Sequence, residues 1–122
     1  MATKFREFIT RNGTTVLAGK NAQNNESLIE QAEDNEELFH TVAAGSPFVN
    51  IKDKPKKGDI KEAAVFCARY SRDWKKNKED VEIHRFKKKD VYKEKSMALG
   101  TFGIKKFKKI KVTEEDIKNW LQ

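Results

Sequence analysis

Residues 59–74, DIKEAAVFCARYSRDW, decide the fold, because they carry the clearest helical pattern in the 122-residue sequence. Apolar residues recur there at steps of three and four, which places them on one side of a helix: Ile60, Ala63, Ala64, Cys67, Tyr70 and Trp74. Asp59 and Glu62 have the spacing of a capping box at the amino end. The small side chains of Ala63, Ala64 and Ala68 predict that the helix packs closely against a sheet.

Short β-prone runs and short helical patterns surround this helix. Asn12-Gly13 separates the runs 5–10 and 14–18, which is typical of a β-hairpin. Further strands are predicted at 37–42, 48–51, 81–86 and, with a bulge, 104–112, and further helices at 25–32 and, capped by Thr113, 114–121. We therefore predict an α/β sandwich of the α+β type, with a mostly antiparallel sheet, two main helices and a short C-terminal helix. We expect one domain over residues 1–122.

The charge of the chain is concentrated in its second half. Residues 1–60 contain 8 Lys and Arg against 9 Asp and Glu, whereas residues 61–122 contain 18 against 10. Between positions 85 and 111 there are 11 cations and 2 anions. Cations at this density repel one another unless solvent or a polyanion lies nearby, so nucleic acid is the first partner to consider.

The remaining composition argues against several other classes of protein. The lone cysteine, Cys67, cannot form an internal disulfide or a zinc site of the usual spacing, and its place on the apolar helix face predicts inert packing. No segment approaches the roughly 20 apolar residues that span a bilayer, and the amino terminus lacks a signal-peptide core. We expect a soluble cytoplasmic protein without a cofactor, a metal or a membrane partner.

Several segments, taken in order, resemble the NFACT-R domain, the RNA-binding module of ribosome quality-control and fibronectin-binding-protein-like factors. They are VLAGKNAQNNESL at 16–28, ELFH at 37–40, the Gly45-Ser46 turn before a strand, the Ala63-Ala64 helix as far as Ser71, VEI at 81–83, VYK at 91–93 and the bend from Gly100 to Gly103. The resemblance covers roughly residues 5–112. It implies a domain that binds structured RNA such as tRNA or rRNA, without catalysis, in translation or ribosome quality control.

Two departures from the family pattern bear on function. Many members have a His shortly after the Gly-Ser turn, where this chain has Pro47-Phe48, so any role of that His is lost here. The amino-terminal NFACT domain and the coiled coil of the large factors are absent from this sequence. We therefore expect a stand-alone RNA-binding unit, and the ribosome-rescue activity of the multidomain proteins does not follow.

Two groups of residues are candidates for contact with RNA. The resemblance places a first group at one end of the sheet: Lys20, Asn21, Asn25, His40 and Ser46. The charge pattern gives a second, basic group that would form one cationic surface for phosphates: Arg85, Lys87, Lys88, Lys89, Lys93, Lys105, Lys106, Lys108 and Lys109. His84 is expected to be an exposed strand residue beside this basic group.

Other interpretations remain open at this point. His40 is equally a hydrogen-bonded structural histidine, and Asn21 and Asn25 are equally helix caps and turn formers. The chain could be an RNA-modification enzyme or accessory factor with His40 and Asn25 in a cleft, or a protein-interaction module whose basic face meets an acidic partner. DNA is an alternative ligand, because phosphate contacts read both polymers and only contacts to the 2′-hydroxyl distinguish them.

Overall fold

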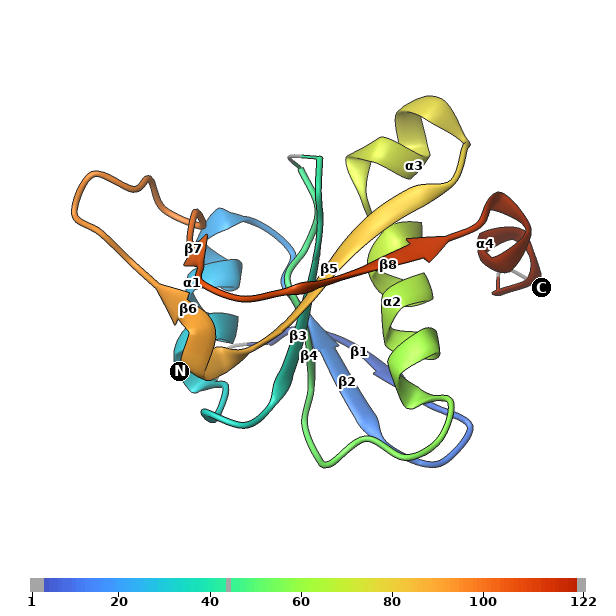
Figure 1. Ribbon diagram of the computed structural model, residues 1–122, viewed down its shortest axis with the longest axis horizontal. Coiled ribbons are helices and arrows are strands. Elements are labelled where there is room, and N and C mark those ends of the chain that lie inside the picture. The colour runs from blue at the N-terminus through green and yellow to red at the C-terminus, as the bar shows by residue number, and fades with distance from the viewer. Residues whose placement is uncertain (1–3, 44, 121–122) are drawn as a thin grey trace.

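A computed structural model describes residues 4–43 and 45–120 of the chain (Figure 1). The strands are β1 (Arg6–Ile9), β2 (Thr15–Ala18), β3 (Glu37–Thr41), β4 (Val49–Ile51), β5 (Val81–Lys87), β6 (Val91–Tyr92), β7 (Gly103–Ile104) and β8 (Lys108–Val112). The helices are α1 (Ala22–Gln31), α2 (Asp59–Arg69), α3 (Arg72–Asn77) and α4 (Glu114–Trp120), with a 3₁₀ turn, η1 (Lys88–Asp90), after β5.

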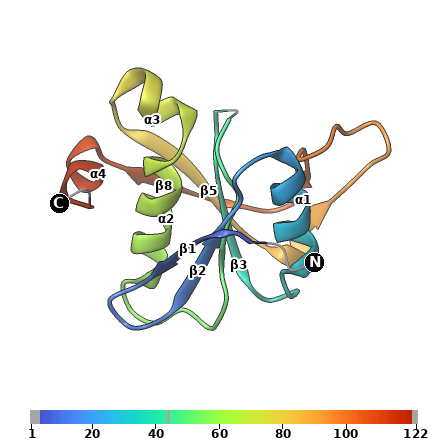
Figure 2. The same cartoon turned by 180° about the vertical axis from the view of Figure 1, so that it is seen from behind.

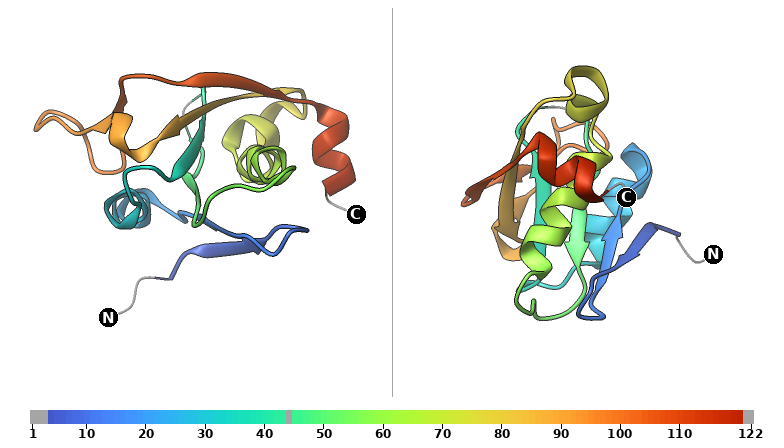
Figure 3. Two further views of the ribbon diagram at one scale, coloured as in Figure 1. Left: turned by 60° about the horizontal axis from the view of Figure 1, so that its bottom comes forward. Right: turned by 90° about the vertical axis from the view of Figure 1, so that its right-hand side faces the viewer.

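The strands form a six-stranded sheet in the order β1-β2-β4-β3-β5-β8, and β6 and β7 form a separate two-stranded ribbon. Every neighbouring pair in both sheets is antiparallel. Figure 3 shows the edge strands β1 and β8 at opposite margins of the sheet. The predicted α+β class and the mostly antiparallel sheet are confirmed.

Helices cover both faces of the central strands. Leu38 and Phe39 are neighbours on β3, so they point to opposite faces, and both are fully buried. Phe39 packs in a cluster with residues of α2 such as Ala63 and Ala64, whereas Leu38 packs with Leu28 and Ile29 of α1. Figures 1 and 2 show α1 and α2 on the two sides of the strands. Because both faces are buried, nearly every residue of β3 is buried.

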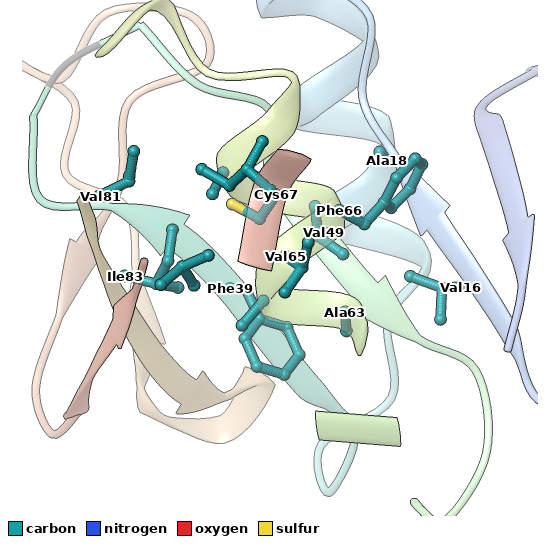
Figure 4. Packing of buried hydrophobic residues seen from close by; sticks show 14 of the residues in the cluster. Val16, Ala18, Phe39, Val49, Ala63, Val65, Phe66, Cys67, Val81 and Ile83 are labelled. Atoms are coloured by element: carbon teal, nitrogen blue, oxygen red, sulfur yellow. The ribbon is translucent and has the colours of Figure 1, made fainter. Parts of the chain in front are cut away.

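The predicted long helix over 59–74 is two helices. The chain turns at Ser71, whose hydroxyl oxygen accepts a hydrogen bond from the backbone N–H of Trp74 (3.1 Å) and so caps the new helix α3. The apolar stripe of α2 is buried as predicted, with Cys67 in the middle of the cluster (Figure 4). Burial raises the pKa of the Cys67 thiol far above its usual range, which keeps it protonated.

The predicted capping box at the start of α2 is wrong. Gly58, with φ of +92°, occupies the cap position, and Asp59 is the first helical residue. The Asp59 carboxylate is fully buried and accepts hydrogen bonds from the Thr14 hydroxyl (2.7 Å) and the Lys56 backbone N–H (2.8 Å). Glu62 instead accepts a hydrogen bond from the backbone N–H of Arg11 (3.2 Å). Both carboxylates therefore tie the helix to the hairpin and its neighbouring loop.

The amino-terminal hairpin forms as predicted. The turn between β1 and β2 contains Asn12 and Gly13, and Gly13 adopts a φ of +84°, which favours glycine. Helix α1 begins at Ala22, three residues earlier than predicted, because the Asn21 side chain accepts a hydrogen bond from the Asn24 N–H (2.8 Å). The predicted cap role of Asn21 is thus confirmed.

The predicted bulged strand over 104–112 is also two elements. Ile104 belongs to β7 and pairs with Val91, whereas β8 begins at Lys108 and pairs with β5.

Helix α4 begins after Thr113, whose hydroxyl accepts a hydrogen bond from the Asp116 N–H (3.1 Å). Leu121, predicted to pack inward from this helix, lies outside the described residues. None of the helices in the described ranges is long and apolar enough to cross a membrane.

Candidate nucleic-acid interface

A cleft of about 620 Å³ lies at one end of the sheet, between the start of α1, the β3–β4 turn, α3 and the β6–β7 ribbon. It brings together all five residues of the first predicted group: Lys20, Asn21, Asn25, His40 and Ser46. They come from three separate segments of the chain, at 20–25, 40 and 46, so only the fold assembles them. This cleft is the candidate RNA-binding site.

Three cations that the sequence analysis did not select also line the cleft. Arg6 comes from β1, and Arg72 and Lys75 come from α3. Together with Lys20 they give the cleft four permanent positive charges, and none of the described residues that line it is Asp or Glu. Four cations on a cleft without an acidic residue in its described lining are suited to a polyanionic ligand.

Asn25 supports the wall of the cleft. The side-chain oxygen of Asn25 accepts a hydrogen bond from the backbone N–H of Phe48 (3.2 Å), and Asn25 is buried. Gly19 lies so close to this side chain that an added Cβ would be 1.8 Å from Asn25 Oδ1. The Gly-Lys-Asn segment therefore needs glycine at position 19 to bring Lys20 to the cleft beside α1.

His40 lines the cleft as a partly buried residue. Its Nδ1 donates a hydrogen bond to the carbonyl oxygen of Thr41 (2.8 Å), and its ring lies against Phe48 with 4.3 Å between ring centroids. Burial lowers the pKa of His40, and the nearby His84 lowers it further, while hydrogen bonding to Thr41 opposes the shift. The imidazole is therefore neutral at pH 7, and the charge of the cleft comes from Arg and Lys.

The Ser46 hydroxyl is occupied within the protein. It accepts a hydrogen bond from the Thr41 N–H (3.1 Å) and donates one to the Pro47 carbonyl (3.2 Å). These bonds close the turn between β3 and β4 beneath His40. Ser46 thus shapes the cleft, and any hydroxyl contact to a ligand would have to replace an internal hydrogen bond.

The β6–β7 ribbon is anchored against α1 at the rim of the cleft. Lys93 Nζ donates hydrogen bonds to Glu26 (2.6 Å) and to the carbonyl oxygens of Ala98 (2.7 Å) and Thr101 (2.8 Å). Gly100 has a φ of +80°, and a Cβ there would lie 2.9 Å from the Ala22 Cα. Lys93, placed in the second group for its charge, holds this ribbon in place.

The second, basic group is dispersed over several surroundings. Arg85 forms a bidentate ion pair with the buried Glu37 on β3. Its Nε donates to Glu37 Oε1 (2.9 Å) and its Nη2 donates to Glu37 Oε2 (3.2 Å). Lys88 Nζ donates to the Ala32 carbonyl at the end of α1 (3.0 Å). Lys108 and Lys109 are successive residues of β8, so they point to opposite faces of the sheet. That the whole basic group forms a single cationic surface therefore stays a prediction.

Part of this basic group does meet around a second hollow, of about 580 Å³, at the end of β5. Its basic lining residues are Arg85, Lys87, Lys105, Lys106 and Lys108, while Lys88, Lys89, Lys93 and Lys109 do not line it. Glu37 and Asp90 also line this hollow, so its charge is mixed. The cleft near His40 is therefore the more purely cationic of the two sites.

Sequence signals for the missed cations are weak. Arg72 and Lys75 are three residues apart, so they share a side of α3, but this spacing is informative only once the break at Ser71 is known. Arg6 lies on the edge strand β1, with its guanidinium 4.1 Å from the centroid of the Tyr70 ring. That contact joins residues 64 positions apart and has no local signature.

Comparison with known proteins identifies the family. The sequence profile of the NFACT protein RNA binding domain matches residues 4–106, so the chain belongs to this family, which is an RNA-binding module. The resemblance found in the sequence alone is thereby confirmed.

Two individual proteins show how far the likeness extends. The chain is 40% identical over 68 residues to the archaeal Rqc2 homolog aRqcH of Methanocaldococcus jannaschii, a match that covers 52% of the chain and 10% of that protein. The C-terminal structure of the fibronectin/fibrinogen-binding protein from Streptococcus suis superposes with a TM-score of 0.82 and 25% identity over 98% of the chain and 49% of that structure. The chain thus spans about a tenth of the archaeal protein and about half of the solved C-terminal structure.

Proposed function

We propose that the chain binds structured RNA, tRNA or rRNA, through the cleft around His40, without catalysing a reaction on it. The observation that carries the proposal is the convergence of Arg6, Lys20, Arg72 and Lys75 on a cleft whose described lining contains no carboxylate. Membership of the NFACT RNA-binding family supports the same ligand class. The likeness to an Rqc2 homolog supports a role in ribosome quality control, which would place the protein in the cytoplasm beside ribosomes.

The cleft suits recognition of the RNA backbone. Lys and Arg side chains bind phosphate oxygens wherever the fold of the RNA presents them, and such contacts position the RNA without reading its sequence. The cations come from β1, the β2–α1 turn and α3, so they match a ligand whose phosphates are spread over a bent surface. Binding through several phosphates should weaken steeply as the salt concentration rises.

A matched pair of charge reversals tests the cleft directly. Lys75 and Lys76 are adjacent exposed residues of α3, but only Lys75 lines the cleft. In fluorescence anisotropy titrations with a purified tRNA, Lys75→Glu should weaken binding and reduce the slope of log K against log salt by about 1 or more. Lys76→Glu makes the same change in net charge and should have a much smaller effect.

The outcomes of this comparison are distinct. Selective weakening by Lys75→Glu supports binding through the cleft. Equal weakening by both variants would show that only net charge matters, and unchanged binding by both would place the RNA elsewhere. Absence of RNA binding by the unmodified protein would contradict the proposed function itself.

A further inference from the structure

A row of side chains leads from the cleft across the sheet to its edge. His40 on β3 is directly opposite His84 on β5, and His84 is directly opposite Lys109 on β8. Residues paired in register across antiparallel strands present their side chains on the same face. His40, His84 and Lys109 therefore form a continuous row on the face of the sheet that α1 partly covers.

Phe107 lies over the middle of this row. Its ring packs on His84, with 4.0 Å between ring centroids and 33° between the ring planes. The strand pattern predicts an exposed His84, whereas the structure shows it partly buried. Phe107 itself belongs to neither hydrophobic cluster and keeps 46% of its surface exposed. Core packing therefore does not explain why the Phe107 ring is held against His84 and still exposed to solvent.

The side chains around Phe107 suit the two parts of a nucleotide, its base and its phosphate. Lys105, Lys106, Lys108 and Lys109 flank it in the sequence, all are exposed, and within residues 4–43 and 45–120 none of them forms an ion pair. Phe107 also lines the hollow of about 580 Å³ at the end of β5. A base can stack on the ring while its neighbouring phosphates meet the ammonium groups, and stacking accepts every base because each has a π-face.

We propose that Phe107 is a stacking platform for an unpaired base of a single-stranded RNA segment, whose phosphates bind the flanking lysines. The strand pairing that joins Lys109, His84 and His40 places this platform on the same face of the sheet as His40 in the cleft. His84 supports the ring of Phe107 from beneath and is a positioning residue. This inference rests on the proposed RNA-binding function and adds an unpaired loop or end to the structured RNA that the cleft binds.

The test compares two polyanions, one with bases and one without. The probes are a labelled oligouridylate of about ten nucleotides, within the usual site sizes for single-stranded binding, and inorganic polyphosphate of similar charge. The variants are Phe107→Ala, Phe107→Trp and, as a control, Ile9→Ala. Ile9 has a similar exposure of 50% but lies on β1, at the opposite edge of the sheet. Thermal unfolding confirms that each variant is folded.

We expect Phe107→Ala to lose affinity only for the probe that carries bases. Phe107→Ala should bind oligouridylate about 10-fold more weakly and polyphosphate as tightly as the unmodified protein does. Phe107→Trp, which retains a π-face, and Ile9→Ala should bind both probes normally. Unchanged oligouridylate binding by Phe107→Ala would overturn the inference, as would equal weakening for both probes.

The result also separates this inference from the proposed function. If the unmodified protein binds tRNA but Phe107→Ala binds oligouridylate normally, only the stacking platform is wrong. If the unmodified protein binds no RNA, both the platform and the proposed function are wrong.

Discussion

The side-chain oxygen of Asn25 accepts a hydrogen bond from the backbone N–H of Phe48, 23 residues further along the chain (3.2 Å). The carbonyl of Phe48 in turn accepts from the N–H of Gly19 (3.0 Å). These bonds join the first turn of α1, the end of β2 and the start of β4 at one point. The cleft wall that presents Lys20 is built on this junction.

Removing the Asn25 amide should therefore destabilise the protein. Asn25→Ala leaves the Phe48 N–H buried without an acceptor, which should lower the free energy of unfolding by about 1–3 kcal/mol. The measurement is urea unfolding followed by circular dichroism. Gln23→Ala, at an exposed position of the same helix, is the control and should change it by less than about 0.5 kcal/mol. Equal effects of the two substitutions would contradict the structural role of Asn25.

A second stability prediction concerns the ion pair between the buried Glu37 and the partly exposed Arg85. Arg85→Ala would leave the Glu37 carboxylate buried without its partner, and we expect a loss of about 3 kcal/mol in the free energy of unfolding. Lys108 is directly opposite Arg85 on β8 but is exposed and unpaired among the described residues, so Lys108→Ala is the matched control. If urea unfolding at low salt shows that Arg85→Ala is no more harmful than Lys108→Ala, Arg85 is available for other partners.

Acid should destabilise the protein through Asp59. Burial acts to raise the pKa of this carboxyl, but hydrogen bonds from Thr14, Lys56 and neighbouring side chains outweigh burial and lower the pKa from 3.8 to about 2. The unfolded chain therefore binds a proton at higher pH than the folded protein does. The stabilisation is complete above about pH 4 and is lost as the pH falls toward 2.

The pH dependence of unfolding in urea checks this prediction. Asp59→Asn should be less stable at pH 7 and should show a smaller loss of stability between pH 4 and 2 than the unmodified protein. Asp53→Asn, on the exposed loop before α2, should retain the original profile. An unaltered acid profile in Asp59→Asn would show that other carboxyl groups dominate this transition.

Local sequence patterns predict much of the fold. The Asn12-Gly13 hairpin and the buried stripe of α2 depend on backbone preference and on helical periodicity, which neighbouring residues determine. The split of 104–112 into β7 and β8 depends instead on distant partners, since the Lys105 N–H donates to the Asp90 carbonyl (2.8 Å). Sequence order alone does not indicate to which sheet each half belongs.

The candidate site was likewise predictable in part from the sequence and in part only from contacts between distant residues. Resemblance to the family selected the five residues that the fold gathers in the cleft, among them Lys20 and His40. Counting charge selected Arg85 and Lys93, whose cations are held by Glu37 and Glu26. A carboxylate far away in the sequence lies beside each of these cations in the fold, which a count of charge along the chain does not reveal.

The most direct test of RNA binding by the cleft is an NMR titration of the ¹⁵N-labelled protein with a purified tRNA. Broadening or shifts should be concentrated at the backbone amides of Gly19, Lys20, Gly45, Arg72 and Lys75, which line the cleft. The amides of Asp53, Lys54, Lys56 and Lys57, in the exposed loop before α2, should change little. Changes centred on that loop, with the cleft amides unaltered, would contradict the account.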